Sequence, residues 1–153
     1  MSKEMTIKDA LQLAIDEEIK AYNLYNETSQ KVKNSGARKM LVELANEELK
    51  HREALEKIIT NDDYKALGNA IDRNKFGIAE FLEETQLKET ASIQEILIFA
   101  IKEEEKALNF YNAMKLNFPG TDMQEVFGRL AAEEMGHKQK LEREYEEHIL
   151  REN

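Results

Sequence analysis

The chain has 153 residues, of which 41% are hydrophobic and 35% are charged, and it contains one proline and no cysteine. This composition is too apolar for a disordered chain, and the length fits one domain with a real core. The formal net charge of −9 disfavours nucleic acid as a partner, because an acidic surface repels phosphates. Without cysteine, these residues can form no disulfide, no Cys-ligated metal site and no thiol nucleophile.

Four long segments carry apolar residues at alternating steps of four and three, which predicts amphipathic helices. The first covers 6–33 and the second 37–60, and the short turn Asn34-Ser35-Gly36 separates them. Together they should form an antiparallel hairpin over 6–60. Three polar residues interrupt the apolar series of this hairpin, namely Glu18 on the first helix and Glu48 and His51 on the second.

The connection over 61–91 is much longer than the two turns, and it includes a predicted short helix over 78–87. A helix of about 25 residues is roughly 38 Å long, a distance that an extended chain covers in about a dozen residues. The connection can therefore run the length of the molecule. The next helix should then start in the same direction as the helix over 37–60.

The remaining two helices are predicted over 93–117 and 122–151, with Pro119-Gly120 between them, so 92–151 should form a second hairpin. Ser92 with Glu95, and Thr121 with Gln124, have the spacing of capping boxes. We therefore predict an all-α fold. It is one domain over 1–153, a four-helix bundle in which a long crossover joins two hairpins.

The two hairpins are copies of one another. A shift of 86 residues superimposes their apolar series without a slip, and it also superimposes their polar residues. The pairs that matter here are Glu18 and Glu104, Tyr25 and Tyr111, Glu48 and Glu134, and His51 and His137. Two such copies should pack around a pseudo-twofold axis, which brings four carboxylates and two imidazoles to one level of the bundle.

Four buried carboxylates require neutralisation, because each costs several kcal/mol to desolvate and they repel one another. Two divalent cations would balance the four negative charges. A Glu and a His three residues apart lie on the same helix face, and carboxylates with one imidazole per ion suit iron or manganese. The predicted ligands are Glu18, Glu48, His51, Glu104, Glu134 and His137. The competing interpretation is a solvated acidic face without a metal, and the repeated spacing argues against it.

Other residues near this level have roles that spacing alone leaves open. The acids Glu17, Glu47, Glu103 and Glu133 also repeat, but they point toward the flank of the apolar series. Tyr25 and Tyr111 lie about 10 Å along the axis from the glutamate of their own helix. Each hydroxyl could therefore support a ligand carboxylate only on another helix, and the alternative is a half-buried core tyrosine.

The segments EIKAYNLY (18–25) and EEKALNFY (104–111), with EELKH (47–51) and EEMGH (133–137), resemble the motifs of the ferritin-like superfamily, and of rubrerythrins most closely. The resemblance implies a ferritin-like bundle with two iron ions that reacts with hydrogen peroxide or dioxygen, and it implies a homodimer. Manganese or zinc are alternative metals. The long crossover would also permit an exchange of hairpins between protomers.

Two departures from rubrerythrins bear on function. The chain lacks the Cys-rich rubredoxin module, so electrons would come from a separate donor such as a rubredoxin-like protein. Where rubrerythrins carry an extra carboxylate, this chain has Ala107, which matches Ala21 and makes the site closer to bacterioferritin-type centres. The expected activity is a rubrerythrin-like peroxidase, with a ferroxidase or iron-handling protein as the first alternative. A redox-inactive metal-binding or structural bundle is the alternative of another class.

The start of the chain, MSKEMTIKDA, has no apolar signal region, and no stretch approaches the length of a membrane span. We therefore expect a soluble, cytoplasmic protein without a membrane partner.

Overall fold

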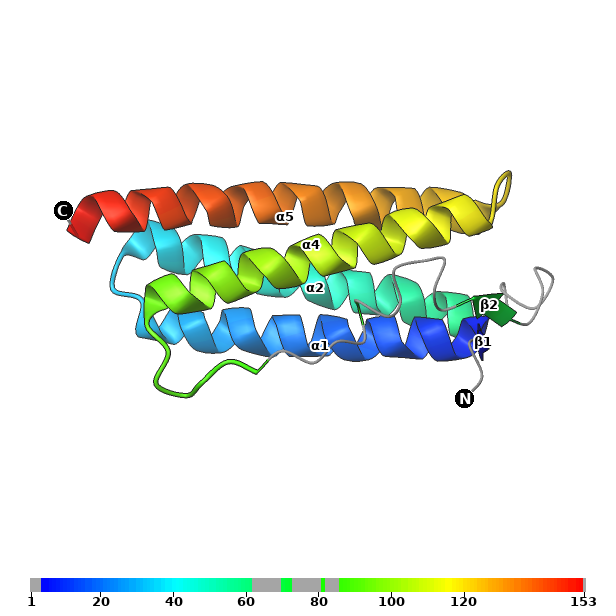
Figure 1. The fold of residues 1–153 in the computed structure, drawn as a ribbon, viewed down its shortest axis with the longest axis horizontal. Helices are drawn as coiled ribbons and strands as arrows, with labels where there is room; N and C mark the ends of the chain where they lie inside the picture. Colours follow the sequence, from blue (N-terminus) through cyan, green and yellow to red (C-terminus); the bar gives the residue numbers. More distant parts are fainter. Residues whose placement is uncertain (1–3, 62–69, 73–80, 82–85, 153) are drawn as a thin grey trace.

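The structure, a computed structural model, describes residues 4–61, 70–72, 81 and 86–152. Four long helices lie side by side and account for most of the described residues (Figure 1). These helices are α1 (Ile7–Lys31), α2 (Ser35–Thr60), α4 (Ile93–Asn117) and α5 (Asp122–Glu152). The predicted all-α bundle is confirmed, and each of the four long predicted helices is present with its ends within two residues of the expected positions.

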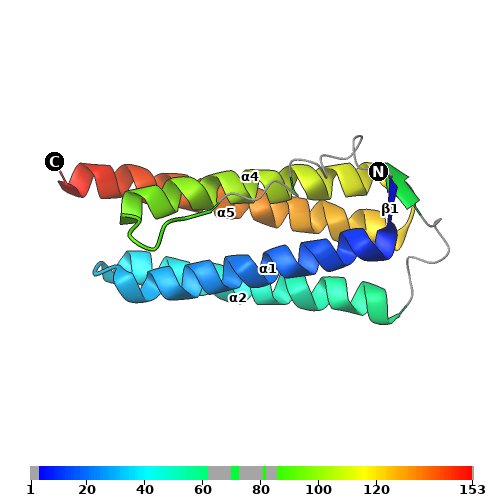
Figure 2. The same cartoon turned by 60° about the horizontal axis from the view of Figure 1, so that its bottom comes forward.

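The helices pair as two antiparallel hairpins. Helix α1 packs mainly on α2, and α4 mainly on α5. Figure 2 shows the two hairpins as separate layers, one above the other. Helix α4 begins at the end of the bundle where α2 begins, so the two helices run in the same direction, as the long connection predicted (Figure 1). The short helix predicted over 78–87 lies mostly outside the described residues.

Local capping explains where the helices start. Ser92 and Glu95 form the predicted capping box at the start of α4. At α5 only half of the predicted box is present, because the side chain of Gln124 accepts from the Gly120 backbone instead of from Thr121. The turn between α1 and α2 is also shorter than predicted. Asn34 caps α2 by accepting from the backbone N–H of Ala37, so Ser35 and Gly36 belong to the helix.

A small two-stranded sheet was not predicted. Strand β1 (Glu4–Thr6) pairs antiparallel with β2 (Ala70–Asp72), with Met5 opposite Ile71. The sheet ties the start of the chain to the crossover at the end of the bundle where α1 begins (Figure 1). Three-residue strands that pair across more than sixty positions leave no periodic signal in a single sequence.

The core consists of two apolar clusters. One contains residues from the first half of α1, the second half of α2, the second half of α4 and the first half of α5, among them Leu11, Leu55, Phe110 and Phe127. The other contains residues from the opposite halves, among them Leu41, Leu97 and Leu141. The buried charged residues lie along the helices between these two clusters. No helix in the described part of the chain is both long and apolar enough to cross a membrane.

Candidate metal centre

The six side chains predicted as metal ligands meet in the polar layer between the two apolar clusters. None of them is more than 3% exposed. Helices α1 and α4 each contribute one glutamate, Glu18 and Glu104. Helix α2 contributes Glu48 and His51, and α5 contributes Glu134 and His137. The i, i+3 spacing places each Glu-His pair on one face of its helix, and the two imidazole rings lie nearly parallel with centroids 5.5 Å apart.

The donor atoms form two overlapping sets of four residues and a smaller group of Glu48, His51 and His137. In each set one donor atom per residue lies within 4.8 Å of all the others. The first set is Glu18, Glu48, His51 and Glu134, and the second is Glu48, Glu104, Glu134 and His137. Glu48 and Glu134 belong to both sets, whereas each of the other glutamates belongs to one. This arrangement is suited to two ions that share two carboxylates.

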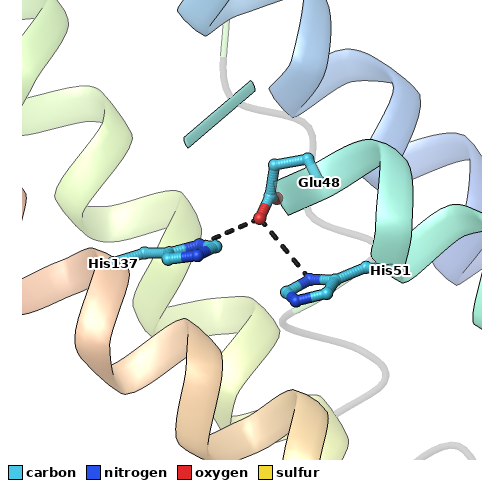
Figure 3. A group of neighbouring side chains, drawn as sticks. All are labelled: Glu48, His51 and His137. Carbon is cyan, nitrogen blue, oxygen red and sulfur yellow. Dashed lines mark ion pairs between the residues drawn. The ribbon is translucent and has the colours of Figure 1, made fainter. Parts of the chain in front are cut away.

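The shared carboxylates lie between the imidazoles. Oε1 of Glu48 is 2.9 Å from Nδ1 of His137 and 3.5 Å from Nδ1 of His51. Dashed lines mark these two contacts in Figure 3. Oε1 of Glu134 mirrors this, at 2.7 Å from Nδ1 of His51 and 3.8 Å from Nδ1 of His137. Glu18 and Glu104 instead each approach one imidazole, at 3.5 Å and 3.7 Å. The pseudo-twofold symmetry of the sequence therefore extends to the donor atoms.

The residues fit a bound cation pair, because many of their buried donor atoms lie close to one another without a hydrogen bond of good geometry to any described residue. These atoms are Oε2 of Glu18, Oε1 of Glu48, Nδ1 of His51, Oε2 of Glu104, both carboxylate oxygens of Glu134 and Nδ1 of His137. Buried polar atoms are normally paired, since an unpaired one costs about 1–3 kcal/mol. Lone pairs that converge without hydrogen bonds are what a metal ion requires.

The outer nitrogen of each imidazole contacts a carboxylate from the opposite hairpin. Nε2 of His51 lies 2.7 Å from Oε2 of Glu133, and Nε2 of His137 makes a short contact with Oε2 of Glu47. With its outer nitrogen donating to a carboxylate, each imidazole is held with Nδ1 toward the centre, where Nδ1 can bind a metal once its proton has left. The sequence showed that Glu47 and Glu133 repeat, but it did not indicate that they serve the histidine of the other copy.

The comparisons with known proteins agree with this geometry. The model of the rubrerythrin family matches the chain over residues 9–94 and 95–153. The chain belongs to the rubrerythrin family. Each of the two matches contains most of one hairpin, in keeping with the internal duplication.

Two solved structures extend the similarity of this rubrerythrin-family chain. One is described as a ferritin-like diiron-carboxylate protein of Thermotoga maritima, with 24% identity and a TM-score of 0.78 over 96% of this chain and 99% of that one. The other is a dodecameric thioferritin of Bacteroides fragilis, a bacterioferritin-related protein. It has 25% identity and a TM-score of 0.70 over 94% of this chain and 86% of that one. A search of curated proteins finds no match.

The two tyrosines reach across the bundle, as their spacing requires. The hydroxyl of Tyr111 on α4 donates to Oε1 of Glu18 on α1 at 2.6 Å. The hydroxyl of Tyr25 on α1 makes the equivalent short contact with Oε1 of Glu104 on α4. Each tyrosine is fully buried, and burial, followed by the charges of the nearby carboxylates, raises its pKa well above the ordinary value of 10.0. Both hydroxyls therefore stay protonated and hold one oxygen of each unshared glutamate.

In the metal-free protein, the buried carboxylates and imidazoles bind protons where the cations would otherwise lie. Burial and the neighbouring charges of Glu104 and Glu18 raise the pKa of Glu48 well above its ordinary value. Burial and the carboxylates around Glu134 do the same to its pKa. Burial alone would lower the pKa of His137, but its contacts with Glu104 and Glu48 outweigh burial and raise that pKa to about 11. A metal must displace these protons in order to bind.

The metal-free protein should therefore lose stability as the pH rises. The folded state keeps the proton of His137 up to about pH 11, whereas an unfolded chain releases it near 6.5. The raised pKa values of Glu48 and Glu134 act in the same direction. We expect the chelator-treated protein to unfold at a temperature several degrees lower at pH 9.5 than at pH 6.5, as measured by circular dichroism. A His137→Gln variant should show a smaller dependence, and a metal-free protein that becomes more stable with pH would contradict this account.

The carboxylates behind the histidines should tune the affinity for metal. Glu47→Gln or Glu133→Gln leaves all six proposed ligands in place but removes the charge that orients one imidazole. We expect a loss of about 10- to 100-fold in metal affinity for each variant, measured in competition with a chelator of known affinity. Glu146→Gln, an exposed position on α5, serves as the control. Unchanged affinity in both variants would show that these contacts are incidental.

Proposed function

We propose that this chain is a non-haem di-iron oxidoreductase that reduces hydrogen peroxide, or dioxygen, with electrons from a separate donor. The observation that carries the proposal is the pair of overlapping ligand sets that share Glu48 and Glu134 in a rubrerythrin-family chain. Four glutamates carry four negative charges, which two divalent ions balance. Buried carboxylate and imidazole donors in this ratio favour iron or manganese, and zinc would bind without redox chemistry.

Reduction of hydrogen peroxide to two waters consumes two electrons and two protons. When bound, a pair of ferrous ions supplies those two electrons. The residues of this chain hold the site in place for that chemistry. Glu48 and Glu134 would join the two halves of the site, because both belong to each set of four. Tyr25 and Tyr111 each hold one oxygen of an unshared glutamate, and Glu47 and Glu133 orient the imidazoles. The two apolar clusters cover the layer on both sides along the bundle axis.

A ferroxidase is the second candidate, and it uses the same six residues with ferrous iron as a substrate. The observation that favours it is the near symmetry of the site. Ala21 and Ala107 occupy equivalent positions, and neither offers the extra carboxylate that the resemblance to rubrerythrins leads one to expect. The similarity to a bacterioferritin-related protein supports the same candidate.

The oligomeric state and the source of electrons are also part of the proposal. We propose a homodimer or a larger oligomer, supported by the family and by the dodecameric state of the similar thioferritin. The absence of cysteine leaves the chain without a rubredoxin-type iron site of its own, so the proposed donor is a separate protein.

The two activities are separated by rapid mixing of the protein loaded with two ferrous ions per chain. A peroxidase should oxidise both irons with one equivalent of hydrogen peroxide and return to the ferrous state when a reduced rubredoxin-like donor is added. A ferroxidase should react faster with dioxygen and should keep consuming ferrous iron beyond two per chain. A loaded protein that reacts with neither oxidant would leave only a redox-inactive binder.

A further inference from the structure

A cavity of about 310 Å³ reaches the candidate metal centre from the side of α1 and α4. Glu18, Glu48, Glu104 and Glu134 all line it, whereas both histidines and the carboxylates behind them do not. Ala21 on α1 and Ala107 on α4 are equivalent in the duplication, and both line the cavity beside the glutamate of their helix. Two small side chains at matching positions therefore leave this space open.

The cavity is much larger than hydrogen peroxide requires. A water molecule occupies about 30 Å³ of the liquid, hydrogen peroxide is only slightly larger, and a buried cavity of about 150 Å³ already holds benzene. Beyond the ligands, Leu24, Phe81 and Phe99 form an apolar and aromatic part of the wall, beside the polar side chains of Glu17, Lys20, Gln86 and Glu103. Space of this size and character fits a small organic molecule.

The charged residues of the lining argue against an ionic ligand. Glu17 and Lys20 pair with one another at 3.2 Å, and Glu103 pairs with Lys106 at the same distance. The ammonium of Lys20 is thus already matched by a carboxylate, and the two proposed ions would balance the four glutamates that lie deeper in the site. The lining then offers an anion no unmatched positive charge from these pairs, so the ligand that fits best is uncharged.

The cavity also distinguishes between the two halves of the duplicated site. Phe81 of the crossover stacks on Phe110 with ring centroids 4.4 Å apart, and Phe110 in turn contacts the ring of Tyr111. Tyr111 does not line the cavity, whereas its counterpart Tyr25 does. A bound molecule would therefore lie on the Tyr25 half of the centre.

We propose that this cavity admits an uncharged organic hydroperoxide, whose apolar group lies against Leu24, Phe99 and the two alanines while its peroxide group reaches the ligand carboxylates. This inference rests on the proposed function for its reductant. The O–O bond of ROOH breaks, and two electrons from the ferrous pair with two protons from solvent give ROH and water. Hydrogen peroxide would use the same entrance without filling it.

Ala21→Phe and Ala107→Phe fill the cavity while leaving every proposed ligand in place. Ala113→Phe is the matched control, because Ala113 is a half-buried residue of the same helix as Ala107 but does not line the cavity. Circular dichroism and the iron content of each variant establish that it folds and binds metal. Ala21→Leu is the smaller substitution for use if either phenylalanine variant fails to fold.

The first readout is binding to the metal-free protein, with 2-phenyl-2-propanol as the probe, since it is the alcohol that cumene hydroperoxide yields. We expect NMR shifts at Ala21, Leu24 and Ala107 in the natural protein and in Ala113→Phe. The shifts should be lost in the two filled variants. A natural protein that shows no binding, or a filled variant that binds as well, would overturn the proposed cavity site.

The second readout is oxidation of the ferrous protein by cumene hydroperoxide and by hydrogen peroxide. The filled variants should react at least about tenfold more slowly with cumene hydroperoxide, while their reaction with hydrogen peroxide changes much less. A natural protein that reacts with hydrogen peroxide but not with cumene hydroperoxide would overturn the substrate class and leave the proposed function intact. If neither oxidant reacts, the proposed function fails and the substrate class fails with it, and the binding readout still decides whether the cavity is a site.

Discussion

Glu48→Ala should bind fewer than about one metal ion per chain, because it removes a carboxylate that belongs to both ligand sets. Glu134→Ala should behave in the same way, since Glu134 is the other shared residue. Glu18→Ala should be milder and retain about one ion, because the set of Glu48, Glu104, Glu134 and His137 stays complete. Metal analysis after gel filtration under anaerobic, iron-replete conditions measures all three.

The control for this series is Glu53→Ala, an exposed glutamate of the same helix as Glu48, which should retain two ions. The Glu48→Ala protein should still fold when free of metal, since the substitution removes one of four mutually repelling carboxylates. Circular dichroism separates loss of metal from loss of structure. Two retained irons in both Glu48→Ala and Glu134→Ala would mean that the ligands are other carboxylates.

Metal binding should raise the thermal stability of the protein by a large margin. An ion present at about 1,000 times its dissociation constant stabilises the folded state by about 4.1 kcal/mol. Two such ions contribute about 8 kcal/mol, which at roughly 2–4 °C per kcal/mol corresponds to an increase of at least about 16 °C in the unfolding temperature. The physical reason is that the ions would neutralise buried carboxylates of which several oxygen atoms otherwise make no hydrogen bond.

Thermal unfolding of the chelator-treated and the reloaded protein, followed by circular dichroism, measures this difference. The Glu48→Ala protein provides the matched control, because added ferrous ion should stabilise it far less than the natural protein. An increase of only a degree or two in the natural protein would indicate that the cluster is not a high-affinity site.

The sequence was sufficient to predict the bundle and the level of the centre. Helix periodicity is local, so the bounds of all four helices follow from it, and the duplication by 86 residues fixed their relative register. The six polar residues of the apolar series could only meet at one level once the hairpins packed. The same reasoning explains why Tyr25 and Tyr111 contact the glutamates of opposite helices.

What the sequence could not predict depends on distances between helices. Glu47 and Glu133 lie one residue from the proposed shared ligands and point toward the flank, so only the spacing of α2 and α5 decides that they reach the histidines. The β1–β2 pair joins segments far apart in the chain and has no local signal. The unequal surroundings of Tyr25 and Tyr111 arise from Phe81, which belongs to the crossover and has no counterpart in the duplication.

The central claim is that the two overlapping ligand sets hold two iron ions. Full-length protein, produced with ample iron and purified without oxygen, should contain about two irons per chain, and on exposure to hydrogen peroxide it should develop the near-ultraviolet absorption of an oxo-bridged ferric pair. Glu48→Ala treated in parallel should show neither. Natural protein that is folded but carries no stoichiometric metal after this preparation would contradict the account.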